Sequence, residues 1–519
     1  MPDKERTCVN QLLHSTVVVM YVLIMVGIGY WCMRRTKSVG DFFLGGRTLG
    51  PWMSAFAYGT TYFSAVLFIG YAGKLGWGFG IHTLWIVIGN TLIGTLLAWK
   101  LLAGRTRIMT ARLNALTMPE FLNARYDSKA MQIISSIAVF VFLVPYSASV
   151  YMGLSYLFEK ALGLQYNEAL IFLAALTGVY LVMGGYLAVA ISDFIRGIVE
   201  FFGVLIMVFL LAQWQGGFVH TSSELMGNPT VMAPALTMPI PLGPQEMQLL
   251  VPGSVFLVSL ILITSFGPMA LPQMVQKFYS IRSAADVKRA MTVASFFALF
   301  MSFGAYYSGA LTHLYYPDGL PQEIFENDRP NLDMLMPHFI TTMLPHGFVL
   351  IIILLVFSAS MSSLSSLVLV SSSAIAIDLY GAFINRHTNQ KQTMVLMRIL
   401  CAVFVALSLI LAMVKVDVIV NLMVMSWGTL AGVFLAPYIY GLFWKRTTKQ
   451  GAFAGIFTGL ACAIILFLLW GKNGIPVAGA ISMFLPMVVV PIVSLMTPPP
   501  PRELIEAAFG DAHSSGADR

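Results

Sequence analysis

The sequence predicts an all-α, polytopic membrane protein with about thirteen transmembrane helices. Of its 519 residues, 58% are hydrophobic and only 10% are charged, whereas roughly a quarter of the residues in an average soluble domain are charged. The mean hydropathy is +0.81, and apolar stretches of about 20 residues, the length of one helical span, recur along the chain. We therefore expect a single transmembrane domain over residues 1–497 and a short tail over residues 498–519.

Thirteen hydrophobic segments make up this expected domain. Their limits follow the apolar runs of the sequence. The spans are expected near residues 11–32, 51–76, 79–101, 131–160, 166–183, 189–213, 251–275, 291–315, 347–380, 396–415, 417–443, 451–471 and 476–497.

The distribution of basic residues predicts the orientation of the chain. An odd number of spans places the two ends on opposite sides. With the N-terminus outside, 22 of the 30 Lys and Arg residues fall inside, seven fall outside and Arg196 lies within a span. Because basic residues collect on the cytoplasmic side, we expect a plasma (inner) membrane protein with its N-terminus outside and its C-terminus in the cytoplasm. The charge is scattered among short loops, which argues against nucleic acid as a partner.

The second and seventh expected spans contain residues that interrupt helices. The second contains AYGTT, residues 57–61, and the seventh contains Gly267 and Pro268. In lipid, unwound backbone is tolerated only where it faces protein or a water-filled cavity. Breaks five spans apart fit a five-plus-five core of two inverted repeats, about residues 51–213 and 251–443, with one extra N-terminal helix and two C-terminal helices. Two independent packing kinks are the structural alternative.

Nine of the seventeen residues in FSASMSSLSSLVLVSSS, residues 357–373, are serines. On a helix, positions i, i+3 and i+4 share a face, so the Ala359 carbonyl and the Ser362 and Ser363 hydroxyls would offer three neutral oxygens to one small cation. Further ligands would come from unwound carbonyls of the second span. Such a site binds a monovalent ion loosely enough to release it. Close helix packing, with the hydroxyls bonded to their own helix, is the alternative.

A second serine triple overlaps the first. Ser362, Ser365 and Ser366 repeat the same spacing, and Asp193 in GGYLAVAISDFIRG is a candidate anionic partner. A carboxylate inside a span costs about 2.5–3.5 kcal/mol on insertion scales, so Asp193 is a functional candidate whose partner is Na⁺, a proton or Arg196. Arg196 follows three residues later on the same helical face, and a plain Asp193–Arg196 ion pair is the structural alternative.

Several of these segments resemble motifs of one family, the sodium/solute symporters. FFLGGRTLGPWMSAFAYGTTYFSAVLFIG resembles the signature of that family's broken helix, and GGYLAVAISDFIRG is similar to its Gly-Gly-x-x-Ala-Val-x-x-Thr-Asp-x-x-Gln segment. GLFWKRTTKQGAFAG matches its late Phe-Trp-Lys-Arg segment, and SASMSSLSSLVLVSSSAIAIDLY occupies the place of its ion-binding helix. The resemblance covers about residues 10–497. It implies a leucine-transporter-like fold and a sodium-coupled symporter that imports an organic acid, vitamin-like anion, amino acid or sugar by alternating access.

The resemblance also implies two sodium sites. The first would lie on the carbonyls of Thr60, Phe63 and Ala359 and the hydroxyls of Ser362 and Ser363. The second, which only some members have, maps onto Asp193, Ser362, Ser365 and Ser366. Ser192 stands where threonine is usual, and Arg196 stands where many members have glutamine. Arg196 would thus be able to neutralise Asp193 in place of the second ion.

The solute pocket is expected beside the helix breaks, in a protein that works as a monomer. Its expected walls are Tyr62, Ser64, Leu67, Phe68, Trp85, Tyr146 and Phe266. Tyr62 and Leu67 stand where some sugar and proline carriers have polar residues, so these two positions do not favour a sugar or proline. A sodium-permeable channel and a transporter-derived solute sensor are the alternative functions. An enzyme is disfavoured because the sequence has no HExxH motif and leaves Asp193 without a catalytic partner.

Overall fold

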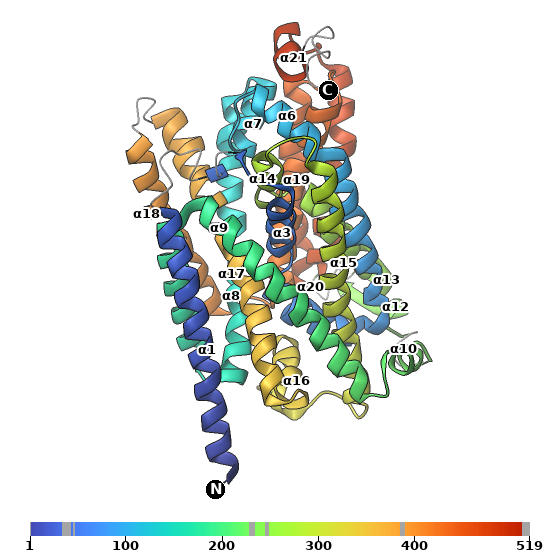
Figure 1. Cartoon of the computed structure of the whole chain (residues 1–519). Coiled ribbons are helices and arrows are strands. Elements are labelled where there is room, and N and C mark those ends of the chain that lie inside the picture. The colour runs from blue at the N-terminus through green and yellow to red at the C-terminus, as the bar shows by residue number, and fades with distance from the viewer. Residues whose placement is uncertain are drawn as a thin grey trace.

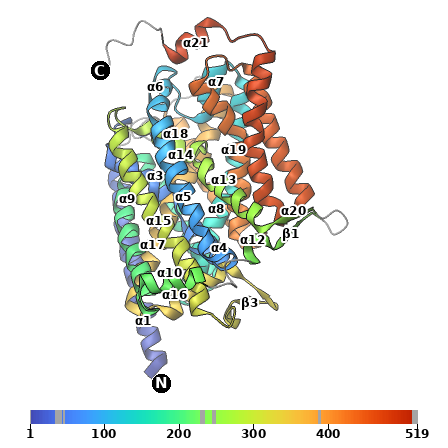
Figure 2. The same ribbon diagram turned by 90° about the vertical axis from the view of Figure 1, so that its right-hand side faces the viewer.

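The computed structural model describes residues 2–33, 43–44, 47–227, 234–243, 249–384 and 390–510. In this part of the chain, helices run between two opposite ends of one elongated bundle (Figures 1 and 2). The first helix starts at one end, and the last helix lies at the other. Nine helices of the described residues are long and apolar enough to cross a membrane, so the protein is a multi-pass membrane protein.

The bundle consists of long helices, several shorter helical segments and two small hairpins. In chain order the main helices are α1 (Pro2–Met33), α3 (Pro51–Tyr62), α4 (Ala72–Phe79), α5 (Leu84–Ile88), α6 (Gly104–Arg112), α7 (Met118–Tyr126), α8 (Lys129–Leu162), α9 (Tyr166–Trp214), α10 (Phe218–Gly227), α12 (Pro234–Thr237), α13 (Gly253–Phe266), α14 (Pro272–Ser280), α15 (Val287–Tyr315), α16 (Leu335–Met343), α17 (His346–Ser373), α18 (Gln390–Val414), α19 (Ile419–Phe443), α20 (Lys449–Met496) and α21 (Arg502–Phe509). Short π- or 3₁₀-helical segments are η2 (Val66–Tyr71), η3 (Gly80–Thr83), η4 (Gly89–Leu97), η5 (Trp99–Ala103), η7 (Gly267–Met269), η8 (Gln322–Ile324), η9 (Leu332–Met334) and η10 (Ala374–Ile384). The antiparallel hairpins are β1 (Pro239–Leu242) with β2 (Leu249–Pro252) and β3 (Phe325–Glu326) with β4 (Arg329–Pro330).

Two helices each combine two of the expected spans. α9 contains two apolar parts, Tyr166–Val179 and Tyr186–Trp214. α20 is divided at Gly471, whose φ of 62° and ψ of −161° are not helical. A positive φ of this kind suits glycine, which has no Cβ to clash with the backbone. The backbone conformation at Gly471 therefore separates α20 near the end of the expected span 451–471.

The first expected break is present, but it lies later than the sequence predicted. Residues 57–61 are still helical, and α3 ends at Tyr62. Phe63 is extended, with φ −109° and ψ 116°, and the Ser64 hydroxyl accepts a hydrogen bond from the Val66 amide at 3.2 Å. The serine thus caps the next helical segment, η2, in the way that Ser commonly begins a helix.

The second expected break is also present and has a simple cause. α13 ends at Phe266, a single 3₁₀ turn covers Gly267–Met269, and α14 begins at Pro272. Proline has no amide hydrogen for a helical bond, yet it suits the first position of a new helix. α3 and α14 both lie in the middle of the bundle in Figure 1, and they contact each other.

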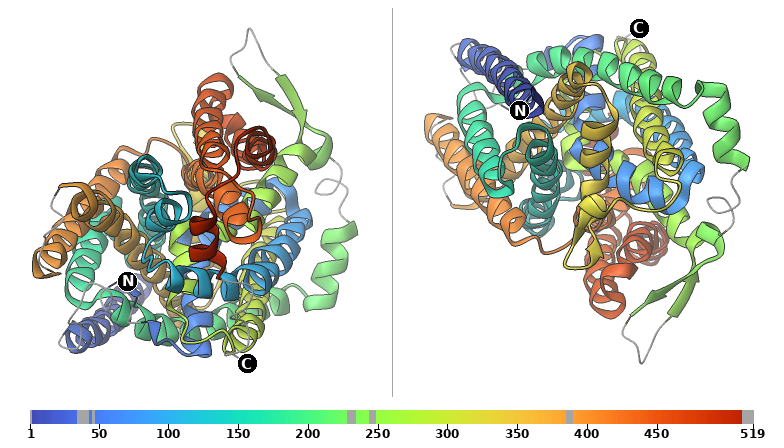
Figure 3. Two further views of the ribbon diagram at one scale, coloured as in Figure 1. Left: turned by 90° about the horizontal axis from the view of Figure 1, so that it is seen from above. Right: turned by 90° about the horizontal axis from the view of Figure 1, so that it is seen from below.

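α17 is the helix that brings the predicted ion ligands to α3. It packs against α9, α8 and α3, within the bundle that Figure 3 shows from its two ends. α4 approaches α15 with backbone contact, because a Cβ built on Gly76 would lie 2.4 Å from the carbonyl carbon of Gly309. The core around the first break is therefore closely packed.

Candidate functional site

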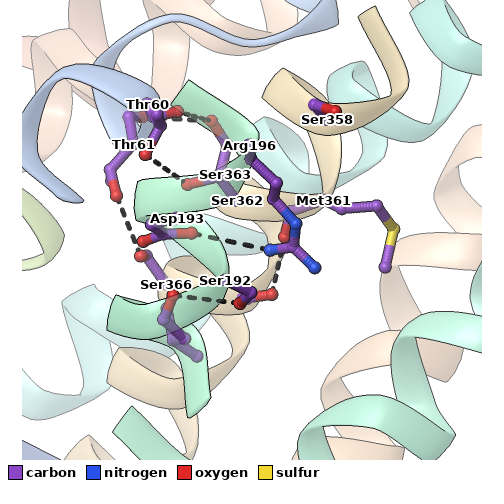
Figure 4. A network of polar contacts seen from close by, with 12 residues as sticks. Thr60, Thr61, Ser192, Asp193, Arg196, Ser358, Met361, Ser362, Ser363 and Ser366 are labelled. Atoms are coloured by element: carbon purple, nitrogen blue, oxygen red, sulfur yellow. Dashed lines mark hydrogen bonds and ion pairs between the residues drawn. The ribbon is translucent and has the colours of Figure 1, made fainter. Parts of the chain in front are cut away.

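The first predicted sodium site brings together the end of α3 and the middle of α17. The Ser363 hydroxyl donates to the carbonyl oxygens of Thr60, at 3.4 Å, and Thr61, at 3.0 Å. The Ser362 hydroxyl donates to the Thr60 hydroxyl at 2.8 Å. Because α3 stops at Tyr62, carbonyls of its last turn lack helical partners, and the serines of α17 fill that role (Figure 4).

The remaining members of the first site also lie at this junction. Ala359 is fully buried on α17, one turn before Ser363. Phe63 is 1% exposed and follows the last residue of α3. The polar side chains and the exposed carbonyls form a set of neutral oxygens with no carboxylate among the predicted ligands. That chemistry suits a weakly held monovalent cation.

The predicted members of the second site are engaged with other groups. The Ser365 hydroxyl donates to the Met361 carbonyl of its own helix at 2.6 Å. The Ser366 hydroxyl is 3.0 Å from the Thr61 hydroxyl and accepts a hydrogen bond of 2.9 Å from the Lys277 ammonium group. For Ser365, the structure thus realises the alternative of a hydroxyl bonded to its own helix.

Asp193 pairs with Arg196, the structural alternative considered above. The Asp193 Oδ1 atom lies 3.5 Å from Arg196 Nη1, and the two side chains face each other on α9 (Figure 4). Both residues are fully buried, as is Glu200 one turn further along. A buried carboxylate is tolerated when a cation compensates it, and Arg196 supplies that charge.

The position of Lys277 in the structure differs from the position that the sequence predicted. Lys277 is one of the 22 basic residues that the sequence predicted to lie inside, in the loop of residues 277–289 after the seventh span, but it lies on α14 and is fully buried. Its ammonium group lies 4.8 Å from the centre of the Tyr186 ring. In the sequence the residue follows Pro272, which marks the end of an apolar run. Lys277 is buried because the break in the seventh span starts a new helix, α14, whose residues are buried in the bundle.

A small cavity of about 20 Å³ adjoins the first helix break. Its described lining residues are Tyr62, Phe63, Ser64, Val66, Leu67, Tyr71, Asn90, Tyr146, Thr264, Tyr306, Met423 and Trp427. All of them are uncharged. Three polar atoms, Asn90 Oδ1, the Tyr71 hydroxyl and Trp427 Nε1, are buried without a hydrogen-bond partner among the described residues. Buried polar atoms usually have partners, so these three are available to a ligand.

Four of the seven predicted pocket residues line this cavity and three do not. Tyr62, Ser64, Leu67 and Tyr146 belong to its walls. Phe68 is buried elsewhere, Trp85 is 59% exposed on the outside of the bundle, and Phe266 packs edge-on against Phe484. Trp85 was expected to reach the pocket from a neighbouring helix, but its side chain lies on the outside of the bundle.

Sequence reasoning missed the residues that later elements bring to the cavity. Trp427 comes from α19 and Tyr306 from α15, and no local pattern links either of them to the break at Phe63. Asn90 did carry a signal, because it is the side-chain amide in the otherwise apolar run WIVIGNTLIGTLL.

The family model for the sodium:solute symporter family matches residues 42–459. The chain belongs to this family. It is therefore a sodium-coupled transporter of a small-molecule solute, and not an enzyme.

Relatives and solved structures agree with this assignment. The chain is 30% identical to the high-affinity proline transporter PutP of Bacillus subtilis over 87% of this chain and 90% of that protein. It is 28% identical to the sodium/proline symporter of Escherichia coli K12 over 88% of each chain. A Na⁺-coupled sialic acid symporter, solved in a substrate-bound outward-open state, superposes with a TM-score of 0.76 at 19% identity over 94% of this chain and 98% of that chain. At that identity the similarity shows a shared fold.

Proposed function

We propose that this protein imports a small neutral amino acid of the proline type together with sodium. The observation that carries the proposal is the uncharged cavity beside the first helix break, which adjoins the candidate sodium ligands. The cavity holds only about 20 Å³, far below the roughly 300–1,000 Å³ that is usual for ligand sites, so the pocket has to widen before a solute enters. A small solute fits such a site better than a disaccharide or a large vitamin.

The chemistry of the cavity favours a solute without net charge. An organic anion would enter a space whose described walls offer no basic side chain, and an uncompensated buried charge is costly. A zwitterion brings both charges with it and needs hydrogen-bonding groups at each end. Asn90, Tyr71 and Trp427 offer unpaired polar atoms, while Leu67, Val66 and Met423 offer apolar contact. The proline transporters among the relatives support the same class of solute.

Tyr62 and Leu67 no longer argue against proline in this proposal. The sequence offered no replacement for the polar residues that some carriers have there, whereas the structure brings Asn90 and Trp427 from other helices to the same cavity. Polar groups from those helices serve in place of polar groups on α3 and η2.

Sodium would bind to the carbonyls of Thr60, Phe63 and Ala359 and to the hydroxyls of Ser362 and Ser363. The Ser363 hydroxyl now donates to the carbonyls of Thr60 and Thr61, and the Ser362 hydroxyl donates to the Thr60 hydroxyl. Rotation of the Ser362 and Ser363 hydroxyls would direct their lone pairs toward the ion. The carbonyl oxygens that lose the Ser363 hydrogen bond would then be free to bind the ion. Tyr62 and Phe63 line the cavity and directly follow Thr60 and Thr61, so sodium would fix the backbone that shapes the solute pocket. Solute and sodium affinities are then reciprocally coupled.

The proposed architecture has thirteen membrane crossings and two inverted repeats, about residues 51–213 and 251–443. The broken elements α3–η2 and α13–α14 support it, because each begins one of the repeats and the two meet in the centre of the bundle. We also propose an N-terminus outside, a cytoplasmic C-terminus and a functional monomer.

One sodium ion is enough to drive strong accumulation. A membrane potential of 100 mV contributes about 2.3 kcal/mol per charge, and a tenfold sodium gradient adds about 1.4 kcal/mol. Together they sustain a solute gradient of a few hundredfold.

Uptake of radiolabelled proline by the purified protein in proteoliposomes tests the proposal. We expect uptake that needs an inward sodium gradient, stops when choline replaces sodium, and is reduced by excess unlabelled neutral amino acids. Excess glutamate or galactose should not reduce it. Competition by glutamate or galactose, or uptake that ignores sodium, would contradict the proposed solute class or the coupling, respectively.

A further inference from the structure

Four charged side chains form a buried cluster next to the first sodium site. Asp193, Arg196 and Glu200 lie on α9, and Lys277 lies on α14. All four are fully buried. The Lys277 charge acts on Asp193 together with that of Arg196, and the Asp193 and Arg196 charges act on Glu200. Charges buried this deeply must compensate one another.

The cluster is already balanced without a metal ion. Two carboxylates face one guanidinium and one ammonium group, so their formal charges cancel. If Glu200 is protonated, the cluster carries one positive charge. In either state, an additional Na⁺ would add positive charge to a fully buried site, at a cost that grows in a medium of low polarity.

The Lys277 ammonium group reaches one of the predicted ligands of a second sodium ion. It donates to Ser366 Oγ, one of the four predicted ligands of that ion, at 2.9 Å. Ser365 donates to its own helix, Ser362 donates to Thr60, and Asp193 pairs with Arg196. Of these predicted ligands, Ser366 is bound by the Lys277 ammonium group, and Asp193 is paired with the Arg196 guanidinium.

We infer that Lys277 is a tethered cation that takes the place of a second sodium ion and limits this transporter to one Na⁺ per cycle. An ammonium group and Na⁺ carry the same charge, but the ammonium group has three donors directed by its side chain and stays with the protein. The Ser366 hydroxyl joins it to Thr61 at 3.0 Å. Lys277 thereby links α14, α17 and α3, as a bound ion would, without being transported.

This inference rests on the proposed sodium site, and binding of ²²Na⁺ to the purified protein tests the two separately. We expect one saturable Na⁺ per wild-type chain, measured without any solute and at constant ionic strength with choline. We expect two for Lys277→Met, because Asp193 and Ser366 lose a cation partner. The double variant Lys277→Met/Asp193→Asn should return to one. Lys288→Met, which changes an exposed lysine of α15, is the matched control and should bind one.

The outcomes separate the two proposals. Two ions in the wild-type protein, or one ion in a folded Lys277→Met variant, would overturn the role of Lys277 while leaving the first sodium site intact. No saturable sodium in the wild-type protein would overturn the first site and, with it, the proposed function. If Lys277→Met does not fold, the wild-type count still decides, and Lys277→Arg, which keeps the charge, should also bind one.

Coupling gives an independent measurement with proline as the probe. With the membrane potential held at zero and a tenfold inward sodium gradient, one ion per cycle sustains about tenfold accumulation and two ions sustain about a hundredfold. We expect about tenfold for the wild-type protein and for Lys288→Met. About a hundredfold accumulation by the wild-type protein would contradict the inference.

Discussion

Ser360 and Ser363 are both fully buried on α17, yet their hydroxyls have different partners. Ser360 donates to the Val356 carbonyl of its own helix at 2.6 Å, whereas Ser363 donates across the interface to Thr60 and Thr61 of α3. Helical spacing predicted which serines share a face with Ala359. It did not predict which hydroxyls would point away from their own helix, because the position of α3 decides that.

We therefore expect Ser363→Ala to weaken sodium binding far more than Ser360→Ala. Removing one of five oxygen ligands should raise the sodium concentration for half-maximal uptake at least tenfold, which corresponds to about 1.4 kcal/mol. Initial rates of uptake over a range of sodium concentrations measure it. Ser360→Ala removes the same atom without touching α3, so it should shift that concentration less than about twofold. Equal responses of the two variants would remove Ser363 from the site.

The sequence predicted some of the buried charged residues but not all of them. Asp193 and Arg196 were recognisable, because a carboxylate inside an apolar span stands out and its partner follows on the same face. Lys277 was not, because it follows a proline-containing break and looks like the first basic residue of a loop. Its burial depends on α14 folding back into the centre of the bundle, which is a tertiary event.

At the scale of elements, the sequence predicted that the second and seventh spans are interrupted, and the structure confirms both breaks. The seventh break was well placed, because Pro268 and Pro272 leave few alternatives. The second was placed several residues early, because glycine and threonine in the run AYGTT weaken a helix without ending it. The observed break instead follows from Phe63 and from Ser64, which caps the next segment.

The crossing of α4 and α15 yields a prediction about packing. Gly76 and Gly78 lie two residues apart on α4, but only Gly76 approaches the backbone of Gly309. We expect Gly76→Val to destabilise the protein by about 1–3 kcal/mol or more, the usual cost of overpacking. Gly78→Val meets no atom within 4 Å and should cost much less. Thermal unfolding of the two purified variants, followed by fluorescence, compares them directly.

A similar loss of stability in both valine variants would mean that the contact with Gly309 does not set the cost. Valine has a higher helix propensity than glycine, so propensity does not explain a loss of stability in either variant. A larger loss of stability confined to Gly76→Val would therefore show that the backbones of α4 and α15 cannot move apart at this contact.

At the scale of the whole molecule, charge distinguishes the two ends of the bundle. α7 lies at the same end as α21 in Figure 2, while the β3–β4 hairpin lies at the other end. The first end carries Arg112, Arg125 and Lys129, whereas the segment before the hairpin carries Asp318 and Glu323. This asymmetry was visible in the sequence, because it depends only on which loops hold the charges and not on how the helices pack.

Asp127 and Asp328 offer a matched test of the proposed orientation. Both are exposed, and both have a positive φ, 49° and 59° respectively. In a background with the four native cysteines replaced, Asp328→Cys should react with a membrane-impermeant maleimide in intact cells, or in spheroplasts if an outer membrane is present. Asp127→Cys should react only after the cells are lysed, because the proposed orientation places its basic end of the bundle in the cytoplasm. Labelling of Asp127→Cys without lysis, with protection of Asp328→Cys, would reverse the orientation and with it the direction of transport inferred from the sodium gradient.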